Sequence, residues 1–355
     1  MQILNLSSLN QNNWMPDFFK RYNEEINQAL KDEINDRLNP IYETHKYYMG
    51  FDNNQDPAEK SVGKRLRPSL VMLSSDAVDG DHEVALLIAT ALEYVHNFSL
   101  IHDDLEDRDK IRHHKPTIWT IWGESAAIIS GNGMLKIADN IMGKLADVNN
   151  IDPSFVLKLQ IEMASSYLKM MEGQYFDIAY ESVSTISMSE YLNMIELKTG
   201  ALIESAMYLG SITKNFPSGN HVVSSQMKSI GHELGRVYQI RDDMLGVWGT
   251  KATGKPVGAD LIRKKKSLPI IHALNNPSRE IRTKIRRFFS TEIIEGNDVE
   301  NILNIMDRIG TYQYCQSLAQ VHWNKANAII SGMDLKNDFV NDLKELGEFL
   351  LTRKL

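Results

Sequence analysis

Apolar residues recur along most of the chain at intervals of three and four positions, which is the spacing of an amphipathic helix. The two-residue alternation typical of β-strands is nowhere convincing, so the pattern predicts an all-α fold. Asp152-Pro153 and Ser189 indicate where two of the helices start. The helices are expected over residues 17–37, 64–79, 82–106, 124–147, 153–180, 188–212, 221–247, 265–275, 278–290, 297–308, 310–332 and 336–352.

The composition is ordinary for a globular protein and limits the possible partners. The 355 residues, 43% hydrophobic and 24% charged, can bury a large core without a linker or repeat, so we expect one helical domain over residues 1–355. The net charge of −7, with basic residues gathered in short motifs, argues against nucleic acid. The lone Cys315 excludes an internal disulfide. We see no signal peptide and no apolar run of the ~20 residues that span a bilayer, so a cytoplasmic location is expected.

Residues 96–107, HNFSLIHDDLED, form the first pattern with chemical content. Asp103 and Asp107 lie four positions apart, so their carboxylates project from one helical face, and His96 joins that face two turns earlier. Buried carboxylates so close together need a positive charge between them. Oxygen ligands suit a hard cation such as Mg²⁺, which is usually shared with substrate phosphates. Taken alone, the motif is equally compatible with a solvated acidic end of a helix.

A second acidic motif, YQIRDDMLG, follows at residues 238–246. Gly231 and Gly235 come from the same side of this helix one and two turns earlier and would let it approach another helix closely. Two acidic helices that face one cavity could hold Mg²⁺ ions between them. The motif residues that share about one helical face are Gln239, Asp242, Asp243 and Gly246.

Four basic motifs accompany the two acidic ones. A solvated surface cluster is the usual fate of any one of them, but a cavity with both metal and basic residues is suited to a diphosphate. The motifs are GKRLRPSL (63–70) with Lys64 and Arg67 on one side of a helical turn, RHHKPTIW (112–119) with Arg112, KTGAL (198–202) with Lys198 and an interruption of the helix at Thr199 and Gly200, and GKPVGADLIRKKKSLP (254–269) with Lys255 and Lys265.

With these motifs the chain resembles the trans-isoprenyl diphosphate synthases, or polyprenyl synthetases, over about residues 60–275. The resemblance depends on the ordered set GKRLRP, DDLED, RHHKPT, EGQYFD, KTGAL, YQIRDD and GKPVGADL. It implies an isoprenoid synthase-type helical fold around a deep cavity, three Mg²⁺ ions bound together with diphosphate, and a homodimer. The implied activity is that of a short-chain prenyltransferase, which joins an allylic diphosphate to isopentenyl diphosphate and makes a C15–C20 product.

The resemblance also implies a role for each matching residue. Asp103 and Asp107 would bind two Mg²⁺ ions and Asp242 the third. The carbonyl at the Lys198–Thr199 break and the side chain of Gln239 would face the allylic cation. Arg112, Lys198 and Lys255 would hold the allylic diphosphate, Lys64, Arg67 and His96 would hold isopentenyl diphosphate, and Lys265 is a further substrate-binding residue.

The chain departs from the family pattern at several of these positions. Gly246 stands where a third carboxylate is usual, His113 where a second Arg is usual, and Asn132 where an Asp is usual. A neutral His cannot replace a bidentate guanidinium, which puts the binding of isopentenyl diphosphate in doubt. Further departures are Val62, His114 and Trp119.

These departures keep two alternatives open. The first is a terpene synthase on the same fold, which would ionise a prenyl diphosphate without isopentenyl diphosphate. Trp119, Trp122 and Trp248 could stabilise its cations, although tryptophans at such positions are more often core or interface residues. The second is an inactive regulatory subunit, against which the intact Asp103, Asp107 and Asp242 argue.

Product length is expected to depend on the helix that carries the first acidic motif. Phe98 lies five residues before Asp103, and Tyr94 lies about one turn further away. Because Phe98 is followed by the small Ser99, a single aromatic would block the growing chain. By resemblance, this predicts a C15 or C20 product, unless Phe98 only packs in the core.

Overall fold

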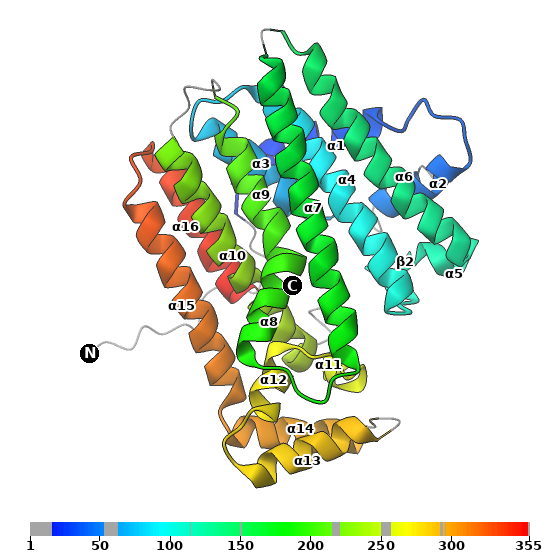
Figure 1. Ribbon diagram of the computed structural model, residues 1–355, viewed down its shortest axis with the longest axis vertical. Helices are drawn as coiled ribbons and strands as arrows, with labels where there is room; N and C mark the ends of the chain where they lie inside the picture. The colour runs from blue at the N-terminus through cyan, green and yellow to red at the C-terminus, as the bar shows by residue number, and fades with distance from the viewer. Residues whose placement is uncertain are drawn as a thin grey trace.

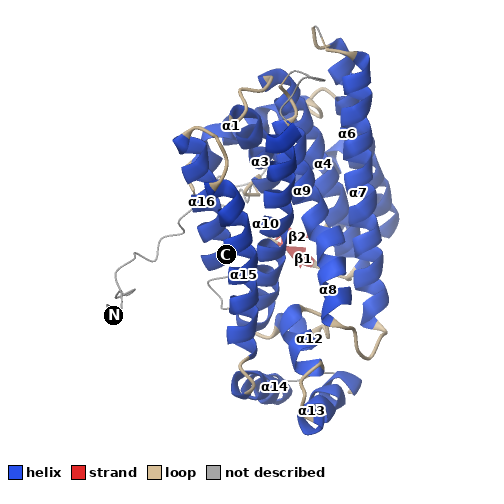
Figure 2. Cartoon of the chain, turned by 60° about the vertical axis from the view of Figure 1, so that its left-hand side comes forward, coloured by secondary structure: helices blue, strands red, loops and turns tan. Residues whose placement is uncertain are grey.

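The protein is almost entirely helical, as the apolar spacing predicted (Figures 1 and 2). The computed structural model describes residues 16–52, 63–113, 115–149, 151–214, 221–249, 257–291, 294 and 296–353. The α-helices are α1 (Phe18–Asp32), α2 (Ile41–Met49), α3 (Leu66–Asp76), α4 (His82–Glu106), α5 (Ile118–Trp122), α6 (Glu124–Gly143), α7 (Pro153–Glu181), α8 (Met188–Ile195), α9 (Ala201–Ser211), α10 (His221–Trp248), α11 (Ala259–Ile262), α12 (Leu268–Leu274), α13 (Arg279–Ser290), α14 (Gly296–Arg308), α15 (Thr311–Ser331) and α16 (Asn337–Thr352).

Four kinds of local structure differ from the expected helices. The short helices α2, α5 and α11 were not predicted, because few turns leave little periodic signal. A 3-10 turn, η2 (Lys144–Asp147), ends α6. A π-helical turn, η3 (Glu196–Gly200), separates α8 from α9 within the expected helix 188–212. The strands β1 (Ile111–Arg112) and β2 (Lys115–Pro116) form an antiparallel hairpin too short to show alternation.

The two predicted helix starts have different outcomes. The carboxylate of Asp152 accepts a hydrogen bond from the backbone N–H of Ser154 and caps α7, so this start is confirmed. The start at Ser189 is wrong by two residues. Ser187 caps α8 because its hydroxyl accepts from the N–H of Glu190 while the Glu190 carboxylate accepts from the N–H of Ser187.

Helix α4 runs through the middle of the largest hydrophobic core and packs chiefly on α6 and α3. Its apolar side chains, including Ile88, Leu92 and Val95, are fully buried. By length and composition alone α4 could cross a membrane, which corrects the expectation that no apolar run is long enough. However, 72% of its most apolar window is buried inside the protein, as in a core helix.

Glycines bring α7, η3 and α10 unusually close together. A Cβ atom at Gly235 would lie 2.7 Å from the Cα atom of Gly200, and one at Gly231 would lie 2.8 Å from the Cα atom of Glu204. From the other side, a Cβ atom at Gly173 in α7 would lie 2.1 Å from the backbone nitrogen of Lys198. The close approach predicted from Gly231 and Gly235 is therefore confirmed, and it fixes η3 between two long helices.

The C-terminal third of the chain makes two further contacts. Helices α13 and α14 lie across one end of the bundle (Figure 1) and share a second apolar cluster with α10, α11 and α12. Helices α15 and α16 pack along α10. This packing brings the end of α16 to the middle of α10, near the second acidic motif.

Candidate active site

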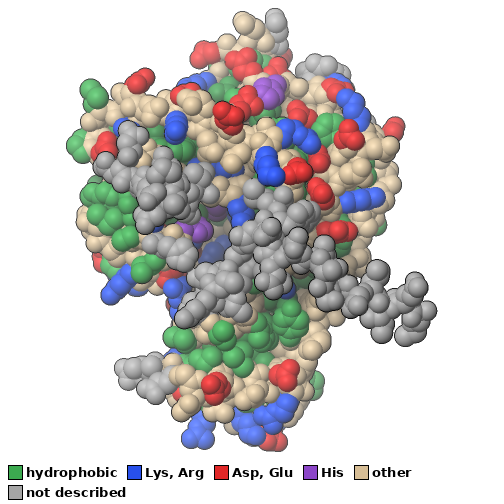
Figure 3. Space-filling model, turned by 180° about the vertical axis from the view of Figure 1, so that it is seen from behind, with side chains coloured by type: hydrophobic (Ala, Val, Ile, Leu, Met, Phe, Trp, Pro, Cys, Tyr) green, Lys and Arg blue, Asp and Glu red, His purple; other side chains and the backbone are tan. Residues whose placement is uncertain are grey.

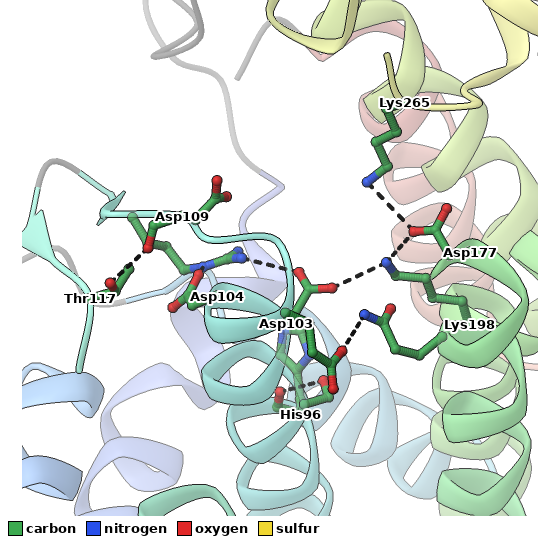
Figure 4. Close-up of polar contacts among 12 residues, drawn as sticks. His96, Asp103, Asp104, Asp109, Thr117, Asp177, Lys198 and Lys265 are labelled. Carbon is green, nitrogen blue, oxygen red and sulfur yellow. Dashed lines mark hydrogen bonds and ion pairs between the residues drawn. The ribbon is translucent and has the colours of Figure 1, made fainter. Parts of the chain in front are cut away.

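The carboxylate of Asp103, near the end of α4, lies between two basic side chains (Figure 4). Its Oδ1 atom is 3.2 Å from Nζ of Lys198, and its Oδ2 atom is 3.2 Å from Nη2 of Arg112. Burial raises the pKa of Asp103, but the positive charges of Lys198, Lys265 and Arg112 outweigh burial and hold the pKa at about 2. Asp103 is therefore a permanent carboxylate with cations on both sides.

Asp107 has a different environment although it lies one turn later. Burial and the negative charge of Asp103 raise the pKa of Asp107 to about 6. Because burial and Asp103 both disfavour the negative charge of Asp107, a bound cation would stabilise this carboxylate. Asp107 is therefore well suited to bind a metal ion. The two acids that the sequence predicted as a pair thus lie together but differ in their affinity for protons.

Asp104, the middle acid of the motif, was not predicted as a site residue. Its side chain is buried, accepts a hydrogen bond from Nε of Arg112, and accepts another at 3.1 Å from the hydroxyl of Tyr48 in α2. Burial raises its pKa to about 6 against the effect of Arg112. Asp104 therefore holds Arg112, which comes from strand β1, in position beside Asp103.

Asp177 in α7 is a second residue that the sequence analysis passed over. Its carboxylate is 2.6 Å from Nζ of Lys198 and 3.8 Å from Nζ of Lys265. These two lysines lower its pKa in spite of burial, which acts the other way. Asp177 is the last residue of the EGQYFD motif, so the signal was visible, but spacing along one helix could not show that it meets Lys198 and Lys265.

The π-helical turn η3 places Lys198 and Thr199 on the same side of the bundle. The Thr199 hydroxyl donates to Oε1 of Gln239 at 2.6 Å, and Nε2 of Gln239 donates to Asp243 at 2.7 Å. Asp243 also accepts from the hydroxyl of Tyr191 at 2.6 Å and from the N–H of Leu268 at 2.7 Å. The orientation of the Gln239 amide is therefore fixed by its neighbours.

The two acids of the second motif point in different directions. Asp243 is buried in the network just described, and burial raises its pKa to about 6. The side chain of Asp242 is 39% exposed, and its Oδ1 atom lies 3.6 Å from Nη2 of Arg353, the end of the described chain. Of the two, Asp242 is the one whose carboxylate is accessible to a ligand.

Gly246 leaves no gap at the position where a third carboxylate was expected. A Cβ atom there would lie 2.2 Å from Oδ2 of Asp260, which belongs to α11. The carboxylate of Asp260 therefore fills this space, and its charge acts on both Lys265 and Asp243.

Two of the three residues expected at one diphosphate site, Arg67 and His96, are in contact. Nη1 of Arg67 is 3.0 Å from Nε2 of His96. Burial and the charge of Arg67 lower the pKa of His96 well below its ordinary value, so the ring is neutral and accepts from Arg67. Nζ of Lys64 lies 5.4 Å from the centre of the Phe349 ring. Basic side chains and a histidine gather in the hollow near the middle of the face shown in Figure 3.

Among the remaining residues that the sequence singled out, those that the structure describes lie on the surface or make structural contacts. Lys255 lies outside the described residues. His113 is exposed on the hairpin with a φ of 49°, and Asn132 is exposed on α6. Trp119 donates from Nε1 to the carbonyl of Asp109 at 2.8 Å, which is a structural contact.

The two residues expected to limit product length are both buried in α4. The hydroxyl of Tyr94 donates to the carbonyl of Leu30 at 2.8 Å, which ties it to α1. The ring of Phe98 lies edge-on to His102 with 4.9 Å between ring centres. His102 in turn faces α6, where a Cβ atom at Gly131 would be 2.4 Å from its ring.

The donor set fits Mg²⁺ shared with a diphosphate better than a metal held by protein alone. Within the described ranges no group of three or more His, Cys, Asp or Glu side chains could hold a metal. Asp103, Asp107 and Asp242 offer hard oxygen ligands, but Mg²⁺ takes about six and usually completes them with phosphate oxygens and water. The basic residues beside these acids suit the same diphosphate.

Comparisons with known proteins agree with this helical, diphosphate-type site. A model of the family described as polyprenyl synthetase matches residues 53–306, so the chain belongs to the polyprenyl synthetase family. It is 28% identical to (2E,6E)-farnesyl diphosphate synthase of Mycobacterium bovis, over 92% of this chain and 89% of that protein. It is 31% identical to geranylgeranyl diphosphate synthase of Mycobacterium tuberculosis, over 84% of each chain. The crystal structure of geranylgeranyl pyrophosphate synthetase from Pyrococcus horikoshii superposes with a TM-score of 0.83 at 30% identity, covering 95% of this chain and 98% of that one. The resemblance inferred from the motifs and the all-α fold class are confirmed.

Proposed function

We propose that the protein is a Mg²⁺-dependent, short-chain trans-prenyl diphosphate synthase, which joins an allylic diphosphate to isopentenyl diphosphate. The observation that carries this proposal is the position of Asp103 between Lys198 and Arg112. A separate basic cluster begins two turns earlier on the same helix, where His96 of α4 contacts Arg67 of α3. One cluster combines acids and bases, as an ionising diphosphate with metal requires. The other is basic, as a diphosphate that does not ionise requires. The names of the relatives support the synthase and give no support to a terpene synthase or a regulatory subunit.

The residues of the first cluster would bind the allylic diphosphate and assist its departure. Arg112, Lys198 and Lys265 would contact its oxygens, and Lys255 would join them. Asp103, Asp107 and Asp242 would hold up to three Mg²⁺ ions, which when bound neutralise the charge that develops on the leaving group. The bond between the allylic carbon and oxygen breaks, and its electron pair leaves with the diphosphate.

The π-helical turn would act on the allylic cation that remains. Thr199 and the backbone of η3 present oxygen dipoles, and the amide of Gln239 is held toward Thr199. Isopentenyl diphosphate, held by Lys64, Arg67 and His96, would attack with its double bond. Transfer of a proton from the resulting cation to the departing diphosphate would complete the C5 extension. Water must be excluded, because it would quench the cation to an alcohol.

The product is proposed to be C15–C20. The relatives include synthases of farnesyl and geranylgeranyl diphosphate, which supports this range, and a synthase of the longer geranylfarnesyl diphosphate. Phe98, buried on α4, would limit the chain, and Tyr94 would lie behind it.

A single set of incubations tests this function. Purified protein with Mg²⁺ and dimethylallyl, geranyl or farnesyl diphosphate is analysed with and without isopentenyl diphosphate. Extended prenyl diphosphates that form only with isopentenyl diphosphate are expected. Cyclic hydrocarbons or prenyl alcohols formed without isopentenyl diphosphate would indicate a terpene synthase. Absence of all products would indicate a regulatory subunit.

We also propose that the chain is one cytoplasmic domain and forms a homodimer. Several large apolar side chains are exposed on neighbouring helices, at Ile128 and Ile129 in α6 and at Ile161, Leu168 and Tyr175 in α7. The three α7 residues are seven positions apart, so they follow one side of the helix and can pack against a second copy.

The oligomeric state can be tested by substituting this surface. Leu168→Glu is expected to convert a dimer to monomers in light scattering. Val321→Glu on α15, where the valine is also exposed, is the matched control and should leave the dimer intact. A monomeric wild type would contradict the proposal.

A further inference from the structure

The π-helical turn η3 is bonded to α10 at two places. Near its C-terminal end, the hydroxyl of Thr199 donates to Gln239. Its first residue, Glu196, makes the second contact, because Nη2 of Arg236 donates to Oε2 of Glu196 at 2.7 Å. Arg236 and Gln239 lie about one helical turn apart on α10. The two contacts therefore hold η3 at its start and near its end, with Lys198 between them.

The conformation of η3 sets the position of Lys198. Nζ of this lysine is 2.6 Å from Oδ2 of Asp177 and 3.2 Å from Oδ1 of Asp103. A π-helical turn is a rare conformation, and such backbone persists only where the surrounding structure holds it in place. A shift at the start of η3 would therefore move Lys198 relative to both acids.

A histidine and a second glutamate extend the contact between Glu196 and Arg236. His232 lies about one turn before Arg236 on α10, and its Nδ1 atom is 3.7 Å from Oε1 of Glu196 and 3.4 Å from Oε2 of Glu204 in α9. The hydrogen bond with Glu204 raises the pKa of His232 although burial acts the other way, and the charge of Glu196 adds to the rise. His232 thus links the start of η3 to α9 as well as to α10.

The pair of Glu196 and Arg236 is less exposed than an ordinary surface ion pair. The side chain of Arg236 is 19% exposed and that of Glu196 is 37% exposed. In the pair of Lys284 and Glu280 on α13, the corresponding values are 55% and 75%. Fully exposed pairs contribute little, because water screens the charges and both side chains lose freedom. The smaller exposure of Arg236 favours a fixed direction for Glu196.

We propose that Glu196 and Arg236 are positioning residues, which hold η3 so that Lys198 and Thr199 keep their places in the site of the allylic diphosphate. Both act through η3 and not on the substrate itself. Arg236 lies three positions before Gln239 and outside the YQIRDD motif, so the motif did not point to it. This inference rests on the proposed function and adds to it the residues that fix the geometry of the ionising site.

The test compares four variants with the wild type. Glu196→Gln removes one charge at nearly constant size, and Arg236→Gln removes the other. The double variant Glu196→Arg/Arg236→Glu reverses the pair and keeps the attraction. Lys228→Gln is the matched control, because Lys228 lies on the same side of α10, two turns before Arg236, and pairs at 3.6 Å with Glu204 of α9 instead of with η3.

Two readouts separate a positioning role from a contribution to stability alone. Steady-state kinetics give kcat and the KM for each substrate. Hydrogen–deuterium exchange measures how often the backbone amides of residues 196–200 open, and it does so without any substrate. Melting temperatures are recorded for every variant.

Each single variant is expected to lower kcat/KM for the allylic diphosphate by about fivefold or more, while the KM for isopentenyl diphosphate changes less than about twofold. Exchange of the η3 amides should accelerate by about fivefold or more, with little change elsewhere in α9 and α10. The reversed pair should recover part of both losses, and Lys228→Gln should behave as wild type.

Three results would contradict these expectations, each in a different way. Unchanged exchange in η3, or a reversed pair no better than the single variants, would overturn the inference and leave the proposed function standing. Equal losses for both substrates with a lower melting temperature would mean that the pair only stabilises the packing of α9 on α10, which also overturns it. If the wild type forms no extended product, the proposed function fails, and the exchange of η3 still decides whether the pair holds the turn.

Discussion

Lys198 Nζ lies 3.2 Å from Asp103 Oδ1, although the two residues are 95 positions apart in the chain. Each favours the charged form of the other. The lysine helps to hold the pKa of Asp103 at about 2, and Asp103 and Asp177 raise the pKa of Lys198 against burial. Both side chains are therefore charged at any physiological pH, and the pair joins α4 to the π-helical turn η3.

Asp103→Ala should lower turnover by a factor of about 10²–10³ or more, because it removes both a metal ligand and the partner of Lys198 and Arg112. The fold should remain intact by circular dichroism. Calorimetry should show that wild-type protein binds Mg²⁺ only when inorganic diphosphate is also present, and that the variant loses this joint binding. Near-normal turnover in Asp103→Ala would refute the assignment of Asp103.

Activity should fall as the pH drops through about 6, because Asp107 takes up a proton in that range and a protonated carboxyl is a poor ligand. The effect on stability has the opposite sign. A raised carboxyl pKa in the folded state means that the stability contributed by this group is lost as the pH rises, not as it falls. Raising the Mg²⁺ concentration should move the acid limb of the rate profile to lower pH. An acid limb that ignores Mg²⁺ would show that Asp107 is not a metal ligand.

Gly235→Ala should destabilise the protein by about 1–3 kcal/mol, because its Cβ atom would lie 2.7 Å from the Cα atom of Gly200. It should also reduce turnover, since separating α10 from η3 moves Gln239 away from Thr199. Gly143→Ala is the control. A Cβ atom there meets no heavy atom of the described chain within 4 Å, and alanine is favoured over glycine in a helix by up to ~1 kcal/mol. Equal thermal stabilities for the two variants would contradict the close approach of α10 and η3.

Gly246→Asp should not improve the binding of Mg²⁺ with diphosphate, although it restores the usual motif. Its Cβ atom would lie 2.2 Å from Oδ2 of Asp260, and the new carboxylate would add to the negative charge of Asp260 and Asp243. We expect a lower melting temperature and weaker binding by calorimetry. Adding Asp260→Ala should restore part of the stability. Tighter binding in the single variant at unchanged stability would show that Asp260 does not occupy this space.

Phe98→Ala should lengthen the product if Phe98 limits the chain, since a small side chain leaves room for further C5 units beside α4. The substitution removes a buried ring that packs on His102, so a loss of stability of about 3–5 kcal/mol is also expected. Chromatography of the products at a temperature where the variant is folded separates the two effects. Tyr94→Phe, which loses only the hydrogen bond to Leu30, is the companion variant. An unchanged product distribution at similar activity would mean that another residue sets the length.

The sequence alone determined the fold class and most of the helices. The 3.6-residue period of apolar positions is set within each helix and does not depend on which other helices it packs against. It also determined which residues share one face, as for Asp103 with Asp107 and for Gly231 with Gly235, since spacing along one helix sets their relative direction. The motif order was sufficient to identify the family.

Only the tertiary structure decided which faces meet. Asp177, Asp104 and Arg353 acquire their partners from other helices, and no spacing in the chain could show that Arg353 ends beside Asp242. The same holds for Gly246. The space beside it is occupied by the carboxylate of Asp260, which comes from the four-residue helix α11. Burial and neighbouring charge, which set the pKa values of Asp103 and Asp107 so far apart, arise from packing in three dimensions and not from the order of residues.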